Sequence, residues 1–213
     1  MYLYDDDKDT FFYGTQHNAK RIPNINSEIV DRISKFLGIP YVYENKPGKK
    51  SFAPLDLLDY IYAVLHSPKY REKYADLLKK DFPRIPYSKN VSLFWKLVDF
   101  GKKLRYLHLF TDLGTGTVSS LKSIKYPISG DNRVERISFD NGRVFINRSQ
   151  YFDGVSAATW NFHLGGYQVA SKWLKDRKGR ALTFDEIDHY CKIIAVLVET
   201  HKLMKKIDLI VEW

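Results

Sequence analysis

The sequence contains a single cysteine, Cys191, among its 213 residues. Disulfides, thiolate zinc sites and iron–sulfur clusters all need several cysteines, so this count excludes them and is typical of a reducing compartment. No apolar run approaches the roughly 20 residues that a membrane-spanning helix requires. The chain also opens with Asp5, Asp6 and Asp7, whereas a secretory signal opens with basic residues. We therefore expect a cytoplasmic protein without a membrane partner.

The motifs of common nucleotide-dependent enzymes are also missing. No two of the eight prolines are adjacent, so the Asn-Pro-Pro-Tyr motif of amino-methyltransferases is absent, and so is a Walker phosphate loop. Residues 112–118, DLGTGTV, look like the glycine-rich loop that holds S-adenosylmethionine. That loop needs a strand before it, whereas a long helix is predicted here. We therefore expect a helix-to-strand turn at 112–118 and no cofactor in this chain.

Side chains suited to metal or nucleophilic chemistry are sparse. Glu44 and Lys46 form a Glu-x-Lys pair that would suit a small metal-dependent nuclease, but the only upstream aspartate cluster lies at the start of the chain. The six histidines have no metal-ligand spacing, and we expect His66 and His163 to be hydrogen-bonded structural residues. Cys191 lies on the apolar stripe of a predicted helix, which indicates a buried, unreactive thiol. We predict no catalytic or metal-binding residue.

Basic residues are abundant. Lys and Arg number 34 against 25 Asp and Glu, which gives a net charge of +9 and a pI near 9.4. The excess gathers over residues 69–84, 120–148 and 171–180. Basic side chains reach phosphates and flat rings stack on bases, so this pattern favours nucleic acid over a merely solvated face. The aromatic residues among these charges are Tyr70, Tyr74, Trp160, Tyr167 and Trp173.

Capping residues and apolar spacing predict helices in the first half of the chain. The predicted helices cover 28–37, 54–66, 68–79 and 91–109. Their expected end residues are Ser27, Gly38, Pro54, Ser67 and Asn90. Strands are predicted in the second half by alternation over 123–127, 133–139, 142–147 and 158–164, with a hairpin turn at Asp140-Asn141-Gly142.

A basic helix over 168–176 and a long helix over 184–207, which starts at a Thr183–Glu186 capping box, complete the prediction. The fold class is α+β: a helical lobe over about 27–110, a mostly antiparallel sheet over about 120–165 and a long C-terminal helix. Residues 1–20 form an acidic segment that we expect to be disordered or in a strand. Residues 21–208 are expected to form one domain, with a helical subregion over 21–111 and the sheet and closing helix over 120–208.

Four strings follow one another in a familiar order: residues 55–86, 97–109, 160–180 and 187–208. They resemble the C-terminal specificity region of bacterial type ISP restriction-modification enzymes and related single-chain adenine-N6 DNA methyltransferases. The resemblance covers about residues 21–208. It implies a target-recognition domain that is not catalytic alone. Its implied partners are double-stranded DNA and upstream methyltransferase and nuclease domains, with S-adenosylmethionine used by the parent enzyme. A docking domain that packs on those upstream domains is the alternative.

Candidate DNA contacts follow from side-chain chemistry. Arginine binds guanine or phosphate, lysine binds phosphate and glutamine reads adenine. For Arg71 and Arg84 the alternative role is an ion pair with Asp76 or Asp81. Trp160 and Trp173 are expected to pack in the core. The nine predicted DNA contacts are Arg71, Arg84, Tyr167, Gln168, Lys172, Lys175, Arg177, Lys178 and Arg180.

Overall fold

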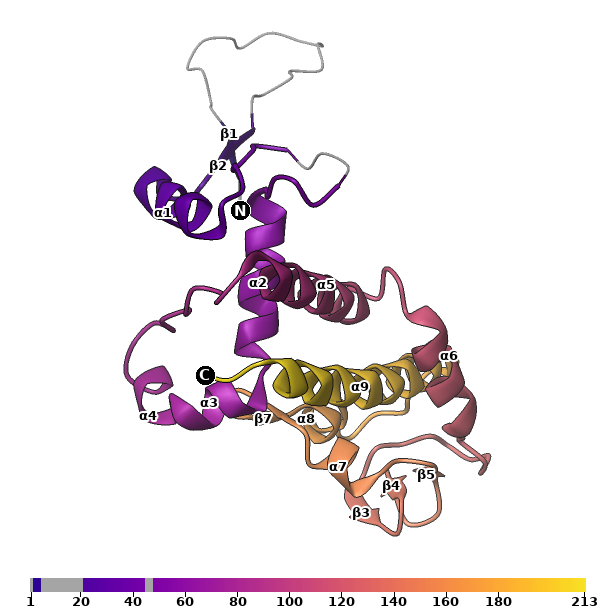
Figure 1. Ribbon diagram of the computed structural model, residues 1–213. Coiled ribbons are helices and arrows are strands. Elements are labelled where there is room, and N and C mark those ends of the chain that lie inside the picture. The colour runs from indigo at the N-terminus through magenta and orange to yellow at the C-terminus, as the bar shows by residue number, and fades with distance from the viewer. Residues whose placement is uncertain (1, 5–20, 45–47) are drawn as a thin grey trace, which may run out of the picture. The chain divides into compact units, whose positions relative to one another are not determined.

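The computed structural model describes residues 2–4, 21–44 and 48–213 (Figure 1). Its contacts divide the chain into two compact units, Met1–Lys102 with Ile210–Trp213, and Lys103–Leu209. Helices and small antiparallel sheets make up the structure, which confirms the α+β class. In the described part of the chain, no helix is both long and apolar enough to cross a membrane. Residues 5–20, most of the predicted acidic segment, lie outside the described residues.

The first unit is mainly helical. Its elements are β1 (Tyr2–Tyr4), antiparallel to β2 (Arg21–Pro23), then α1 (Ser27–Leu37), α2 (Pro54–Leu65), α3 (Pro68–Lys73), α4 (Ala75–Leu78) and the first part of α5 (Val91–His108). The helix prediction over 68–79 is wrong at Tyr74, which leaves the helical region at φ −109° and packs its ring on Tyr70. The cap of α1 is Asn26 rather than Ser27, because the Asn26 side chain accepts the Ile29 amide.

Two buried tyrosines hold the proline-containing segment that leads from α4 to α5. The Tyr60 hydroxyl donates to the carbonyl of Pro86 at 2.8 Å, and the Tyr70 hydroxyl donates to that of Arg84 at 2.9 Å. Trp213 packs its ring against Tyr70 and donates its indole N–H to a serine hydroxyl at the start of α3. The C-terminal residues therefore belong to the core of the first unit.

The helices α2 and α5 are in close contact at Gly101. A Cβ atom built on this residue would stand 1.7 Å from the backbone oxygen of Asp59. The two backbones are therefore in direct contact, and no side chain fits between them.

The second unit combines helices with short strands. Its elements are the end of α5, then α6 (Gly114–Ser123), β3 (Ser138–Asp140), β4 (Arg143–Phe145), β5 (Tyr151–Phe152), α7 (Ala157–Trp160), β6 (His163–Leu164), β7 (Tyr167–Gln168), α8 (Val169–Lys175) and nearly all of α9 (Phe184–Ile210). Strands β3, β4 and β5 form one antiparallel sheet, and β6 and β7 form a hairpin. The predicted Asn141-Gly142 turn is confirmed, with φ of 45° and 81°.

Several predicted strands are absent or shorter. Residues 112–118 enter α6 instead of a turn to a strand, 123–127 contribute only a bridge at Lys125, and 133–139 become a strand only at Ser138. Side-chain hydrogen bonds replace the missing ladder, because the buried Gln150 amide bonds both the backbone and the side chain of Asn132. Residues 158–164 begin as α7, since the Ser156 hydroxyl caps this helix by accepting the Thr159 amide.

The core of the second unit forms around α9. Buried side chains of α9, including Tyr190 and Ile194, pack with Phe152 of β5 and Leu174 of α8. Cys191 is buried as predicted, and burial raises the pKa of its thiol to about 11. The thiol therefore stays protonated and unreactive at neutral pH.

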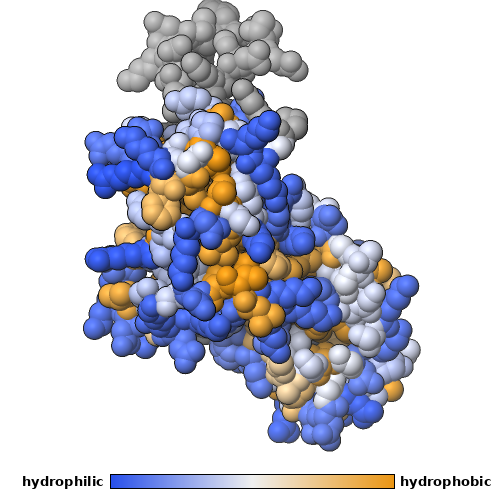
Figure 2. Space-filling view, viewed as in Figure 1, coloured by the Kyte–Doolittle hydropathy of each residue, from blue (hydrophilic) through white to orange (hydrophobic). Residues whose placement is uncertain are grey.

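Hydrophilic residues, blue in Figure 2, cover most of the face shown, and apolar groups lie exposed among them. The most exposed large apolar side chains are Phe82, Phe184 and Leu209, which are 84–89% accessible. These three come from separate parts of the sequence, and singly exposed apolar residues are ordinary on protein surfaces.

Replacing Gly101 by alanine should destabilise the first unit. The new methyl group would overlap the Asp59 carbonyl, and overpacking of this kind lowers the free energy of unfolding by about 1–3 kcal/mol or more. Thermal unfolding would then begin at a lower temperature, by about 2–4 °C for each kcal/mol lost. Gly166→Ala is the matched control, because a Cβ atom there meets nothing within 4 Å. Equal melting temperatures for the two variants would contradict the close helix contact.

Candidate nucleic-acid interface

The hairpin β6–β7 presents an aromatic side chain to solvent directly before a basic helix. Tyr167 is 63% exposed, and Gly165 turns the hairpin at φ 59°. Gln168 is anchored, since its amide nitrogen donates to the carbonyl of Trp160 at 2.7 Å. Of the five aromatic residues that the sequence places among basic charges, Tyr70 is buried, Tyr74 is half-buried and packs on Tyr70, and Trp160 and Trp173 pack against the core of the second unit. Tyr167 is therefore the one of these five with an exposed ring.

The lysines of α8 and the turn after it differ in their partners. Lys172 forms an ion pair with Asp176 one turn later. Lys175 and Lys178 are exposed, and neither pairs with an acidic group among the residues that the structure describes. Their ammonium groups are thus open to an external anion.

Both arginines of the basic run are engaged by one carboxylate, that of Glu186. Arg180 forms a bidentate pair with it, through contacts of 2.6 and 2.9 Å, and Arg177 donates from Nε at 3.1 Å. Arg177 also stacks on Trp173, with its guanidinium carbon 3.5 Å from the ring centroid. The predicted capping box is confirmed, because Thr183 and Glu186 exchange hydrogen bonds. We call Arg177, Arg180, Thr183 and Glu186 the Glu186 cluster.

The Glu186 cluster joins the end of α8 to the start of α9. Hydrogen bonds from Arg180, Thr183 and Arg177 hold the pKa of Glu186 at about 2, although partial burial alone would raise it. The carboxylate is therefore ionised throughout the physiological range. Because each arginine also keeps N–H groups outside these contacts, the cluster fixes the positions of Arg177 and Arg180 without consuming all their donors.

Arg71 and Arg84 lie near Tyr70 in the first unit. The half-buried Arg71 donates from Nε to the carbonyl of Leu65 at the end of α2, and burial lowers its pKa. Arg84 is 83% exposed at its side chain and stands 3.7 Å from Asp81. An exposed pair at this distance contributes little stability, so Arg84 is the more accessible of the two.

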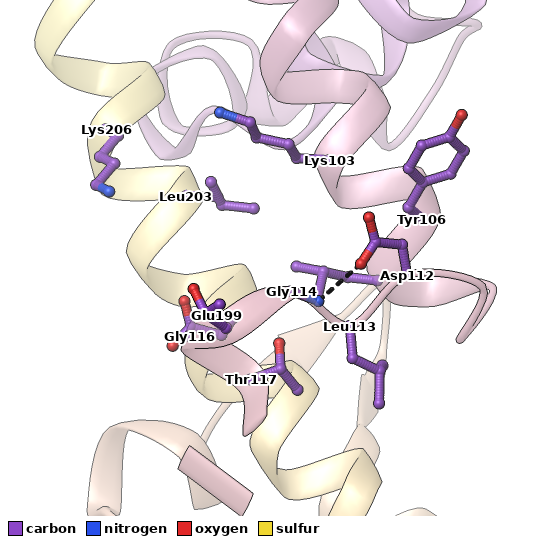
Figure 3. Close-up of a pocket in the computed structure, with 12 residues that line it drawn as sticks. Lys103, Tyr106, Asp112, Leu113, Gly114, Gly116, Thr117, Glu199, Leu203 and Lys206 are labelled. Carbon is purple, nitrogen blue, oxygen red and sulfur yellow. Dashed lines mark hydrogen bonds between the residues drawn. The ribbon is translucent and has the colours of Figure 1, made fainter. Parts of the chain in front are cut away.

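A pocket of about 320 Å³, which the sequence did not predict, lies at the start of α6, over the DLGTGT string (Figure 3). Lysines from α5 and α9 and carboxylates from 112 and 199 line it together with apolar groups. The glycine-rich string was the one signal for it, but the helix before the string argued against a ligand loop.

In the described ranges, no group of three His, Cys, Asp or Glu residues could hold a metal ion. Lys46, one half of the possible nuclease pair, lies outside those ranges. His66 and His163 each place a ring nitrogen 2.7 Å from a backbone carbonyl, as predicted for structural histidines.

The Glu186 cluster predicts a defined acid dependence of stability. The folded-state pKa of Glu186, about 2, lies below the ordinary value of 4.5. The carboxylate therefore stabilises the fold above pH 4.5 and loses this contribution as the pH falls towards 2. Glu186→Gln should lower the free energy of unfolding at pH 6, and the gap to the wild type should shrink between pH 4.5 and 2. Urea titrations across this range, with Asp185→Asn as a control on the same helix turn, measure it. A gap that does not vary with pH would contradict the cluster.

Comparison with known proteins gives one family and several related folds. A sequence model of the type ISP C-terminal specificity domain matches residues 1–206. The structure of a DrdV–DNA complex aligns with a TM-score of 0.66 at 21% identity, covering 90% of this chain and 20% of that chain. No curated protein matches significantly.

Two further solved structures are of type ISP restriction-modification enzymes. The restriction-modification enzyme LlaBIII bound to DNA aligns with a TM-score of 0.64 at 18% identity, over 99% of this chain and 13% of that chain. A nuclease-deletion mutant of LlaGI with a DNA substrate mimic aligns with a TM-score of 0.54 at 24% identity, over 71% and 13%. The chain thus spans a fifth or less of the length of each of these proteins. The matched length of the family model, most of the sequence, shows that the chain belongs to the family of type ISP C-terminal specificity domains.

Proposed function

We propose that this chain recognises a specific sequence in double-stranded DNA on behalf of a restriction-modification adenine-N6 methyltransferase. The observation that carries the proposal is the stretch from β6 to the turn after α8, where the exposed Tyr167 precedes Lys175 and Lys178. Open ammonium groups neutralise phosphates, and an exposed ring beside them stacks on bases or sugars. Family membership and the DNA-bound state of the related structures support the same reading.

The nine predicted contacts differ in their surroundings; Tyr167 is the exposed ring, Lys172 is paired with Asp176, and the other seven divide into three groups. Lys175, Lys178 and Arg84 are the side chains most available to phosphates, because they are exposed and weakly held. Arg177 and Arg180 are held rigid by Glu186, and a pre-positioned guanidinium loses less entropy on binding a base edge or phosphate. Arg71 and Gln168 are anchored to backbone carbonyls and contribute mainly to local structure.

The chemistry of methyl transfer is assigned in this proposal to the parent polypeptide. The chain would hold the target duplex, while an upstream domain with bound S-adenosylmethionine extrudes and methylates the adenine. The chain itself would then be non-catalytic.

Removing the two open lysines should weaken DNA binding without weakening the fold. Each phosphate contact contributes about 0.9 to the slope of log K against log salt concentration, so Lys175→Ala with Lys178→Ala should lower that slope by about 1.8. Fluorescence anisotropy with a labelled duplex over a salt series measures it. The control is Lys35→Ala with Lys50→Ala, which removes the same charge from exposed sites in the first unit. Equal slopes for the two double variants, at unchanged melting temperature, would remove the segment from the interface.

Sequence preference is the decisive property of a recognition domain. Selection from a randomised duplex library by the purified chain, at about 150 mM salt where nonspecific phosphate binding is weak, should enrich a motif of several base pairs. Binding without enrichment would contradict sequence recognition and indicate a general basic clamp. Absence of binding would favour the docking role on the parent's other domains.

A further inference from the structure

The pocket at the start of α6 has its polar groups arranged by charge. Lys103 of α5 and Lys206 of α9 lie at one end of it, as Figure 3 shows. Glu199 and Thr117 lie towards the other end, and Asp112 lies at the side of the pocket, beside Gly114. Leu203 and other apolar groups line the space between these ends. All of these residues belong to the second unit.

The two carboxylates that line the pocket, those of Asp112 and Glu199, are held in place by hydrogen bonds. The Asp112 carboxylate accepts the amide of Gly114 at 2.9 Å, where the chain turns into α6 at φ 64°. Glu199 accepts from Ser120 and Lys202 through Oε1. Its other oxygen, Oε2, faces Gly116, where a Cβ atom would stand 2.6 Å away. The absence of a side chain at Gly116 thus lets the Glu199 carboxylate lie directly against the backbone of α6 at the pocket.

A buried hydroxyl at the same end has no partner. Thr117 is 1% exposed, and among the described residues its Oγ1 forms no hydrogen bond. Leaving such a group unsatisfied is costly, and proteins rarely do so without a ligand or water to bond it. The first-turn amides of Thr115 and Gly116 likewise have no acceptor within a helix. Donors and acceptors therefore converge on the pocket from α6.

The other end of the pocket carries positive charge. Lys206 pairs with no acidic side chain within the described ranges, and Lys103 lines the same space from α5. A simple anion would meet the carboxylates at the far end, so the lining does not suit phosphate alone. A simple cation would meet the lysines. The lining suits a ligand with a phosphate at one end, an apolar ring in the middle and hydrogen-bond donors at the other.

We propose that this pocket binds a single nucleotide. The phosphate would lie between Lys103 and Lys206, the base against Leu203, and hydroxyl or amino donors against Glu199 and Thr117. A volume of about 320 Å³ is at the small end of the range for ligand sites, which suits one nucleotide rather than two. The nucleotide is either free or an unpaired unit of a DNA strand. Binding of a free nucleotide is independent of the proposed DNA-binding function, whereas binding of an unpaired nucleotide of a DNA strand rests on it.

The test titrates the full chain with the four nucleoside 5′-monophosphates, with the matching nucleosides and with inorganic phosphate. Amide shifts of Thr115 and Gly116 in ¹H–¹⁵N spectra report binding at this site. A monophosphate should shift these amides at a lower concentration than either its nucleoside or phosphate alone. Binding of inorganic phosphate only, or unshifted amides with every probe, would overturn the proposal.

Two variants test the contacts at the two ends of the ligand separately. Lys206→Ala should abolish the advantage of the monophosphate over the nucleoside, whereas Lys205→Ala, an exposed control on the same helix, should keep it. Thr117→Val should weaken monophosphate and nucleoside equally, without a loss of melting temperature, because the hydroxyl that it removes has no partner in the protein. Identical titrations of the wild type and both pocket variants would overturn the assignment of the site.

A short single-stranded oligonucleotide, and the same sequence as a duplex, identify the source. If either DNA shifts the amides of Thr115 and Gly116 and competes with the monophosphate, the bound unit belongs to a strand. If only the monophosphate acts, the ligand is free. A chain that binds no DNA in any assay but still shows the monophosphate shifts would remove the proposed function and leave the nucleotide site standing.

Discussion

The connection between α8 and α9 in the second unit depends on the contacts of one carboxylate, that of Glu186. It caps the first turn of α9 through Thr183 and holds two arginines that follow α8. A carboxylate at a helix N-terminus also meets the positive end of the helix dipole. Because α9 carries much of the core of this unit, Glu186 links the end of α8 to that core, on which α8 also packs through Ala170 and Leu174.

This constraint changes the meaning of the basic run at 171–180. In sequence it is a single dense cluster, with five basic residues against one acidic residue. In the structure its members have three different surroundings: the Glu186 cluster, an ion pair to Asp176, and open solvent at Lys175 and Lys178. Charge density along a sequence therefore overestimates the charge that is available to a ligand, because oppositely charged neighbours several residues away neutralise part of it.

Local signals in the sequence predicted the helices well and the strands poorly. Gly38, Pro54, Asn90 and the capping box stand at real helix ends, because caps act within four residues of sequence. The strand predictions failed where residues distant in sequence decide the structure. The Gln150 side-chain amide hydrogen-bonds the backbone of Ile128 and Asn132, which strand pairing would otherwise do. Ser156 similarly turns an alternating segment into a short helix.

The candidate sites divide in the same way. The hairpin–helix segment was visible because its glycines, ring and lysines are contiguous in sequence. The pocket at α6 was not visible, because its lining residues come from α5, the start of α6 and α9, which lie far apart in the sequence. The string DLGTGT did not predict the pocket, because a cofactor loop follows a strand whereas this string follows a helix. Its two glycines instead serve a packed corner, where one admits a left-handed turn and the other leaves room for Glu199. A glycine-rich string thus indicates a close approach to its backbone, and whether a protein side chain or a ligand makes that approach depends on the helices around it.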